Sequence, residues 1–356
     1  MLNEKEIQRY DRQMILRGFG KEKQEKLKAA SVLVIGAGGL GCPALQYLAA
    51  AGIGRLGIVD GDKVEISNLH RQILFNNADI GQNKAAKAAE KINALNAFVK
   101  TDIYSEHLST ENALEIISGY DIIIDGTDNF PARYLINDAC VILGKPNVFA
   151  SISEFSTQVS IFNYSTGAQR GVNYRDLYPV PPAPGEVPSC ADAGVIGALP
   201  GIAGTAQAME VIKLITGIGT PLVDKLWIYD TLSNSSHTIG LSIDETQFPI
   251  CELINYEIFC GHSENIKEID PSELKKHFED YTLIDVRTAD KHNSKNIGGE
   301  NIFIDDLEKK LKDLDKTKTY ALYCSTGNKS KRAAEILQKN GFDKVVTLKG
   351  GLSNYE

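Results

Sequence analysis

Long apolar runs, an excess of positive charge and closely spaced cysteines are all missing from this sequence. No apolar run approaches the roughly 20 residues that span a bilayer, and the polar residues 1–17 do not predict a signal peptide. A formal net charge of -8 argues against nonspecific binding to nucleic acid or to an anionic membrane. We therefore expect a cytoplasmic protein with no nucleic-acid or membrane partner.

The sequence also lacks the spacings of a disulfide framework and of paired metal ligands. The six histidines show no paired spacing, and scattered cysteines fit a reducing compartment in which a reactive thiol persists. The chain has 356 residues, 43% of them hydrophobic and 24% charged, which is typical of a soluble globular protein with two domains. The cysteines stand at positions 42, 140, 190, 251, 260 and 324.

Strand and helix patterns alternate along the first part of the chain. This alternation predicts a Rossmann-like doubly wound α/β sheet that binds ligands at the carboxyl ends of its strands. Five prolines within 174–188 predict a long mobile loop without helix. We expect strands at 31–35, 55–60, 98–103, 120–124, 225–230 and 236–243, and helices at 40–51, 79–95, 109–118 and 201–216.

The last part of the chain predicts a second, smaller α/β domain. The periodic pattern is lost near 255–267, and an apolar strand then begins at Leu283. About 90 residues are enough for such a domain. We expect domains at 1–255 and 266–356, joined by a linker at 256–265.

Glycines after the first strand predict a nucleotide site. Gly36, Gly38 and Gly41 match the dinucleotide fingerprint, and Asp60 ends the second strand, where an acidic residue binds a ribose hydroxyl. On these residues alone, an oxidoreductase that uses NAD or FAD is favoured.

Three charged residues favour a triphosphate instead. Arg71 follows the second strand, Lys84 opens the next helix, and Asp128 follows the fourth strand. Cations and a metal-binding carboxylate offset the charge that develops on phosphoryl oxygens. Asp128 also suits a simpler role, as the N-cap of the helix that contains Arg133.

A second reactive site is predicted at residues 324–330, Cys-Ser-Thr-Gly-Asn-Lys-Ser, ahead of a helix. Successive backbone amides and a helix N-terminus stabilise negative charge on sulfur. We expect this persulfide loop, with Cys324, Gly327, Lys329 and Ser330, to hold a thiolate or persulfide. Combined with a nucleotide site, it predicts ATP-dependent activation of a carboxylate and sulfur delivery to it. An NAD- or FAD-dependent oxidoreductase with an accessory sulfurtransferase domain is the alternative.

Six motifs resemble those of the ubiquitin-activating-type adenylyltransferases, and most nearly the bacterial molybdopterin-synthase and thiamine-biosynthesis adenylyltransferases. They occur in order over roughly residues 5–245. The carboxyl-terminal part resembles a rhodanese-like domain through residues 284–287 and the persulfide loop. The six motifs are residues 9–13, 36–41, 60–62, 68–72, 126–129 with Arg133, and 190–195.

This resemblance implies adenylation of the C-terminal glycine of a ubiquitin-like sulfur-carrier protein ending in Gly-Gly, then sulfur transfer to form a thiocarboxylate. Cofactors would be ATP and Mg²⁺, the metal held by Asp128. A cysteine desulfurase or thiosulfate would supply persulfide sulfur, and the pathway stays open among molybdopterin, thiamine, tRNA thiolation and other routes. The ATP-binding set would be Gly36, Gly38, Gly39, Gly41, Asp60, Asp62, Asn68, Arg71, Gln72, Lys84 and Asp128.

The resemblance also implies a homodimer in which Arg12 of each chain reaches into the active site of the other. Cys190 stands where some relatives hold the carrier covalently, and a loop cysteine that merely packs is the alternative. The predicted catalytic set is Arg12, Arg71, Lys84, Asp128, Cys190 and Cys324.

The sequence departs from these relatives at their structural zinc. Many relatives bind zinc between two Cys-x-x-Cys pairs, whereas this chain has residues 173–176 without cysteine at the first place and only Cys251 at the second. One thiol cannot complete a closed tetrahedral site, so no zinc is predicted. The loop at 173–190 is then expected to lack the tether that the metal provides.

Overall fold

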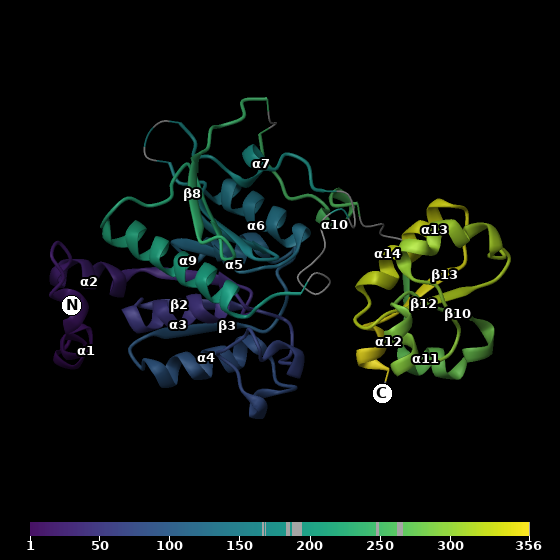
Figure 1. The fold of residues 1–356 in the computed structure, drawn as a ribbon. Coiled ribbons are helices and arrows are strands. Elements are labelled where there is room, and N and C mark those ends of the chain that lie inside the picture. The colour runs from purple at the N-terminus through teal and green to yellow at the C-terminus, as the bar shows by residue number, and fades with distance from the viewer. Residues whose placement is uncertain are drawn as a thin grey trace. The chain divides into compact units, whose positions relative to one another are not determined.

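The structure is a computed structural model that describes residues 1–165, 167, 169–182, 186, 194–246, 249–261 and 266–355 (Figure 1). It divides into two compact units, Met1–Tyr256 and Glu257–Glu356. Within those described ranges, no helix is both long and apolar enough to cross a membrane.

The first unit is built on an eight-stranded sheet in the order β3-β2-β1-β4-β5-β6-β7-β8. Strands β3 to β5 of this order are parallel, and β6, β7 and β8 extend the sheet antiparallel. The predicted Rossmann-like α/β fold is confirmed. The strands are β1 (Ser31–Ile35), β2 (Arg55–Val59), β3 (Lys100–Tyr104), β4 (Ile122–Asp125), β5 (Asn147–Ser153), β6 (Ser156–Phe162), β7 (Lys225–Asp230) and β8 (Ser235–Gly240).

Helices cover this sheet and bury its apolar side chains. Helix α3 packs against α4 and α9, and α5 packs against α6. The fully buried core includes Val32, Leu45, Leu48, Ile58 and Ile124. The helices are α1 (Glu4–Met14), α2 (Gly20–Ala29), α3 (Gly41–Ala51), α4 (Lys84–Leu95), α5 (Ala113–Ser118), α6 (Phe130–Leu143), α7 (Tyr174–Leu177), α9 (Ala198–Thr216) and α10 (Tyr256–Phe259).

Helix boundaries follow from capping. Helix α4 begins at Lys84 and not at the predicted residue 79, because the Asn83 side chain caps it by accepting a hydrogen bond from the Ala86 amide at 3.0 Å. The predicted linker at 256–265 begins with α10, and its residues 262–265 lie outside the described part of the chain.

The prediction of a loop without helix at 174–188 is wrong for its first residues, which form the one-turn helix α7. The Asn173 side chain caps this turn by accepting from the Arg175 amide at 2.8 Å, while Asp176 accepts from the Asn173 amide at 2.8 Å. The prolines begin at Pro179, beyond the turn, and so do not interrupt it.

Two buried carboxylates tether α7 without any thiol. Asp138 of α6 is 1% exposed and accepts from both Nε and Nη2 of Arg175, at 2.8 and 2.7 Å, and from the Tyr256 hydroxyl at 2.8 Å. Asp176 accepts two hydrogen bonds from Arg170, at 2.6 and 2.7 Å. The start of the 173–190 loop is therefore held by ion pairs.

The second unit is a five-stranded, all-parallel sheet in the order β11-β10-β12-β13-β9, which confirms the predicted smaller α/β domain. Helix α14 packs on β12 and β13, and Leu322 and Leu337 are fully buried between them. The elements are β9 (Lys267–Ile269), α11 (Pro271–Lys276), β10 (Thr282–Asp285), α12 (Ala289–Ser294), β11 (Glu300–Asn301), α13 (Leu307–Lys310), β12 (Tyr320–Tyr323), α14 (Asn328–Lys339) and β13 (Val345–Leu348).

Replacing Asp138 by alanine should lower the free energy of unfolding by about 3–5 kcal/mol, because the change removes the buried carboxylate that pairs with the largely buried Arg175. Urea unfolding followed by circular dichroism measures this difference. The matched control is Glu22→Ala, which breaks an exposed ion pair with Lys26 and should leave stability nearly unchanged. Equal losses of stability in the two variants would contradict the role of Asp138 in holding α7.

Candidate functional site

The sheet order reverses between β1 and β4, and the predicted nucleotide site lies at the carboxyl ends of these strands. Gly36 directly follows β1 and has φ +91°. A Cβ on it would lie 2.8 Å from the carbonyl oxygen of Gly126, which follows β4. A Cβ on Gly41 would lie 1.8 Å from the Gly36 carbonyl oxygen. The turn therefore requires glycine at both positions. It leads into the N-terminus of α3, where backbone amides could bind an anion.

Asp60 fixes this glycine turn from the end of β2. Its carboxylate accepts hydrogen bonds from the Ala37 amide at 2.8 Å and from the Asp62 amide at 2.9 Å. Burial raises the pKa of the Asp60 carboxyl, and the positive charge of Lys84 opposes that rise. Each carboxylate oxygen keeps a free lone pair, so the residue still fits the predicted contact with a ribose hydroxyl.

Arg71 and Gln72 cover the glycine turn. A Cβ on Gly39 would lie 3.7 Å from Arg71 Cδ, and a Cβ on Gly38 would lie 3.7 Å from Gln72 Nε2. Gln72 is 4% exposed, and its Oε1 atom has no hydrogen-bond partner among the described residues. An unpaired buried amide oxygen is costly without a ligand, which supports the prediction that this residue faces one.

Asn68 ends a short 3-10 helix, Ile66–Asn68, and Arg71 lies in the turn that follows it. The Asn68 side chain accepts from the Glu65 amide at 3.1 Å, and the Asn68 carbonyl oxygen accepts from the Gln72 amide at 2.9 Å. The Arg71 guanidinium donates to the Ser67 carbonyl oxygen at 3.0 Å. The structure thus brings the predicted Asn68, Arg71 and Gln72 to the turn, with Asn68 supporting the other two.

Lys84 and Asp62 form an ion pair beside the turn, with 2.8 Å between Lys84 Nζ and Asp62 Oδ2. Lys84 is only 6% exposed, although it is the first residue of α4. The structure therefore places both residues of the predicted ATP-binding set at the site, but in contact with one another.

Asp128 lies exposed just beyond β4 and makes no hydrogen bond or ion pair within the described part of the chain. The alternative that it caps α6 is wrong, because the cap is Asn129, whose side chain accepts from the Ala132 amide at 2.9 Å. Mg²⁺ is commonly bound by one or two carboxylates together with substrate phosphates, so an unpaired Asp128 fits that ion. No group of three or more His, Cys, Asp or Glu side chains suited to a metal occurs among the described residues.

Sequence reasoning missed Asp125, which binds Thr127, the residue before Asp128. Fully buried at the end of β4, Asp125 accepts from the Thr127 amide at 2.9 Å and from the Thr127 hydroxyl at 2.6 Å. Burial raises the pKa of the Asp125 carboxyl, and nearby Arg133 opposes the rise. A carboxylate ending an apolar strand was the available signal.

Arg12 and Cys190 complete the predicted catalytic residues of the first unit. Arg12 is exposed in the last turn of α1. Cys190 lies outside the described residues. Their roles therefore stay predictions.

The predicted persulfide loop begins where β12 ends. Cys324 is 2% exposed, and its sulfur accepts from the Gly327 amide at 3.1 Å and faces the Ser330 hydroxyl at 3.7 Å. Gly327 has φ +98°, a left-handed conformation that favours glycine, and it is the N-cap of α14. The loop therefore places one backbone amide, that of Gly327, and the start of α14 at the sulfur, where successive amides were predicted.

Beside this sulfur lies a buried ion pair. Arg287 donates to Asp285 from Nε at 2.9 Å and from Nη2 at 2.6 Å, and His292 contacts the same carboxylate at 2.9 Å. Burial opposes ionisation of Asp285, but hydrogen bonds from Arg287 and His292 hold the pKa of its carboxyl below the usual value. Lys329, predicted to add charge near the sulfur, has its ammonium over the ring of Phe303, 6.0 Å from the centroid.

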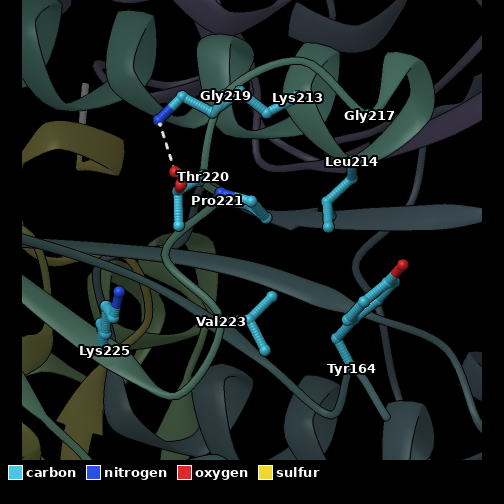
Figure 2. Close-up of a pocket in the computed structure, with 9 residues that line it drawn as sticks. All are labelled: Tyr164, Lys213, Leu214, Gly217, Gly219, Thr220, Pro221, Val223 and Lys225. Atoms are coloured by element: carbon cyan, nitrogen blue, oxygen red, sulfur yellow. Dashed lines mark hydrogen bonds between the residues drawn. The ribbon is translucent and has the colours of Figure 1, made fainter. Parts of the chain in front are cut away.

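A separate cavity of about 390 Å³ lies at the end of α9 (Figure 2). Its Lys213 is already paired with Glu210 at 2.6 Å and donates to the Thr220 carbonyl oxygen at 3.4 Å. None of the predicted site residues lines it.

Comparison with known proteins identifies both units. The chain matches the model of the ThiF family over residues 10–252 and that of the rhodanese-like domain over residues 270–356. It is 43% identical to the probable adenylyltransferase/sulfurtransferase MoeZ of Mycobacterium tuberculosis, over 99% of this chain and 93% of the relative. It is 50% identical to the sulfur carrier protein adenylyltransferase of Thermus thermophilus, over 72% of this chain and 97% of the relative.

Solved structures show the same fold for the first unit. A crystal structure of E. coli MccB with ATP superposes with a TM-score of 0.59 at 23% identity, over 70% of this chain and 75% of that one.

Gly41→Ala should abolish high-affinity nucleotide binding and destabilise the first unit, because its Cβ would meet the Gly36 carbonyl oxygen at 1.8 Å. Gly240→Ala, at the end of β8, is the control, since its Cβ would find nothing within 4 Å and the residue is no part of the glycine turn. Calorimetric titration and thermal unfolding report the two effects. Equal nucleotide affinity in both variants would exclude this turn as the binding site.

Proposed function

Because the chain belongs to the ThiF family and ends in a rhodanese-like domain, we propose that it adenylates the C-terminal glycine of a ubiquitin-like sulfur carrier with ATP and then supplies persulfide sulfur to form a thiocarboxylate. The names of the relatives support this pairing of activities. The observation that carries it is the joint presence of a glycine turn at the N-terminus of α3 and a buried sulfur that faces one backbone amide and one hydroxyl. The oxidoreductase alternative finds no support among these relatives.

Adenylation requires in-line attack of a carboxylate on the α-phosphorus while pyrophosphate leaves. We assign ribose binding to Asp60 and phosphate binding to Arg71 and Lys84, which lie around the glycine turn. The glycine carboxylate is ionised already, so positioning and charge stabilisation supply the catalysis without a general base. A Mg²⁺ ion held by Asp128 would neutralise phosphate charge.

Sulfur transfer uses the second unit. A persulfide on Cys324, loaded from a cysteine desulfurase or thiosulfate, forms a bond from its outer sulfur to the activated carboxyl carbon as AMP leaves, which gives an acyl disulfide. A thiol then attacks the Cys324 sulfur, so that the S–S bond breaks, the thiocarboxylate leaves and Cys324 remains in a disulfide that a further thiol reduces. The Gly327 amide and the N-terminus of α14 stabilise the charged sulfur in this step. Cys190 is the proposed point at which the carrier is held covalently.

The proposed assembly is a cytoplasmic homodimer. Arg12 is exposed at the end of α1, as a residue that enters the site of a second subunit must be. The proposed adenylyltransferase domain spans 1–255, and the rhodanese-like domain spans 266–356.

ATP–pyrophosphate exchange should appear only when a carrier with a free C-terminal Gly-Gly is added, because the carboxylate of that glycine is the nucleophile. Asp128→Ala should reduce exchange more than tenfold, as expected when a carboxylate that holds the metal at the phosphates is lost. Asp121→Ala, at the opposite end of β4, is the control that should retain exchange. Unchanged exchange in Asp128→Ala would remove Asp128 from the site.

Cys324→Ala should abolish persulfide formation and thiocarboxylate product but leave exchange intact, because adenylation uses no thiolate. After thiosulfate treatment, mass spectrometry should find one added sulfur, about 32 Da, on Cys324. Cys251→Ala, which removes an exposed thiol, is the control and should keep both activities. Cys190→Ala should slow only product formation, and a sulfur adduct mapped to Cys190 would reverse the assignment.

A further inference from the structure

The ion pair of Lys84 and Asp62 is unequal in its exposure to solvent. The Lys84 side chain is 8% exposed, whereas that of Asp62 is 57% exposed. A nearly buried ammonium needs a counter-ion, while a carboxylate that faces water does not. The ion pair therefore stabilises the buried charge of Lys84 more than it stabilises the exposed charge of Asp62.

The backbone fixes where this pair lies. The Lys84 amide donates to the Asp62 carbonyl oxygen at 2.9 Å, and the Asn83 side chain donates to the carbonyl oxygens of Asp60 and Asp62 at 3.0 and 3.2 Å. The Asp62 amide is held in turn by the Asp60 carboxylate, which also binds the Ala37 amide of the glycine turn. Lys84 thus lies beside the turn that receives the phosphates.

A carboxylate at this place conflicts with direct binding of ATP. A triphosphate and Asp62 carry charge of the same sign, and the ammonium of Lys84 cannot satisfy both at full strength. The His107 ring also lies near Asp62, with 3.6 Å between Nε2 and Oδ1, and its side chain is 75% exposed. Asp62 can therefore be released to water when Lys84 turns away.

We propose that Asp62 is a positioning residue and not a nucleotide ligand: it holds the Lys84 ammonium while the site lacks ATP and yields it to the phosphates when ATP binds. This inference rests on the proposed use of ATP. It implies that ATP must break an existing ion pair when it binds, which makes its net affinity lower than it would be without that pair. A nucleoside without phosphates leaves that pair intact.

Calorimetric titration of the full chain at low salt with Mg-ATP and with adenosine tests the proposal. Asp62→Asn should bind ATP about three- to fivefold more tightly, the factor that corresponds to loss of one competing, partly exposed ion pair. Its affinity for adenosine should not change. A ligand role for Asp62 predicts the opposite sign, because removing a contact weakens ATP binding.

Glu90→Gln provides a matched control on the same helix. Glu90 is 63% exposed and pairs with Lys87, which is 13% exposed and also pairs with Asp79 at 3.4 Å, so the change removes one negative charge while Lys87 keeps a counter-ion. ATP affinity should not respond to it. If Glu90→Gln tightened ATP binding as much as Asp62→Asn does, the effect would come from net charge alone, and the proposal would be overturned.

A double-variant cycle separates competition for Lys84 from simple repulsion of ATP by Asp62. In a Lys84→Ala background, Asp62→Asn should give much less tightening than in the native background. Equal tightening in both backgrounds, or weaker ATP binding by Asp62→Asn alone, would overturn the role of Asp62. Failure of the native chain to bind Mg-ATP at all would instead overturn the proposed function itself.

Discussion

A contact between two backbones underlies the nucleotide site. The turn after β1 and the turn after β4 approach so closely that Gly36, Gly41 and Gly126 have no room for a side chain. Because of this approach, the N-terminus of α3 and the loop that carries Asp128 face the same volume. The backbone therefore determines where a nucleotide could bind, and the charged side chains act around a place that is already set.

Six of the eight strands of the first unit were predicted from the sequence, whereas β5 and β6 were not. The bounds of β1 and β7 agree with the predicted 31–35 and 225–230. Strand β1 was recognisable as a short apolar run, as is typical of a buried parallel strand. Helix α7 was missed because one turn with a side-chain cap is too short for a periodic signal. Its stability depends on Asp138, far away in sequence, which no local pattern reveals.

The two sites differ in what the sequence revealed. For the persulfide loop, residue types alone indicated the result, because Gly327 and the helix start define where amides point. For the nucleotide site, the sequence predicted which residues lie there but not which of them are in contact. Nothing local indicated that Lys84 and Asp62 would be paired, since that contact depends on how β2 and α4 are joined. Nor did it show Lys329 lying over Phe303.

The division of work between Asp128 and Asn129 has a consequence for how this site can change. Asn129 alone caps α6, so the helix does not depend on its neighbour. The exposed Asp128 therefore occupies a position where different side chains cost the fold little. The residue at position 128 can therefore change while α6 keeps its start. The chain thus combines a fixed helix start with a neighbouring exposed carboxylate, the one that we propose holds the metal.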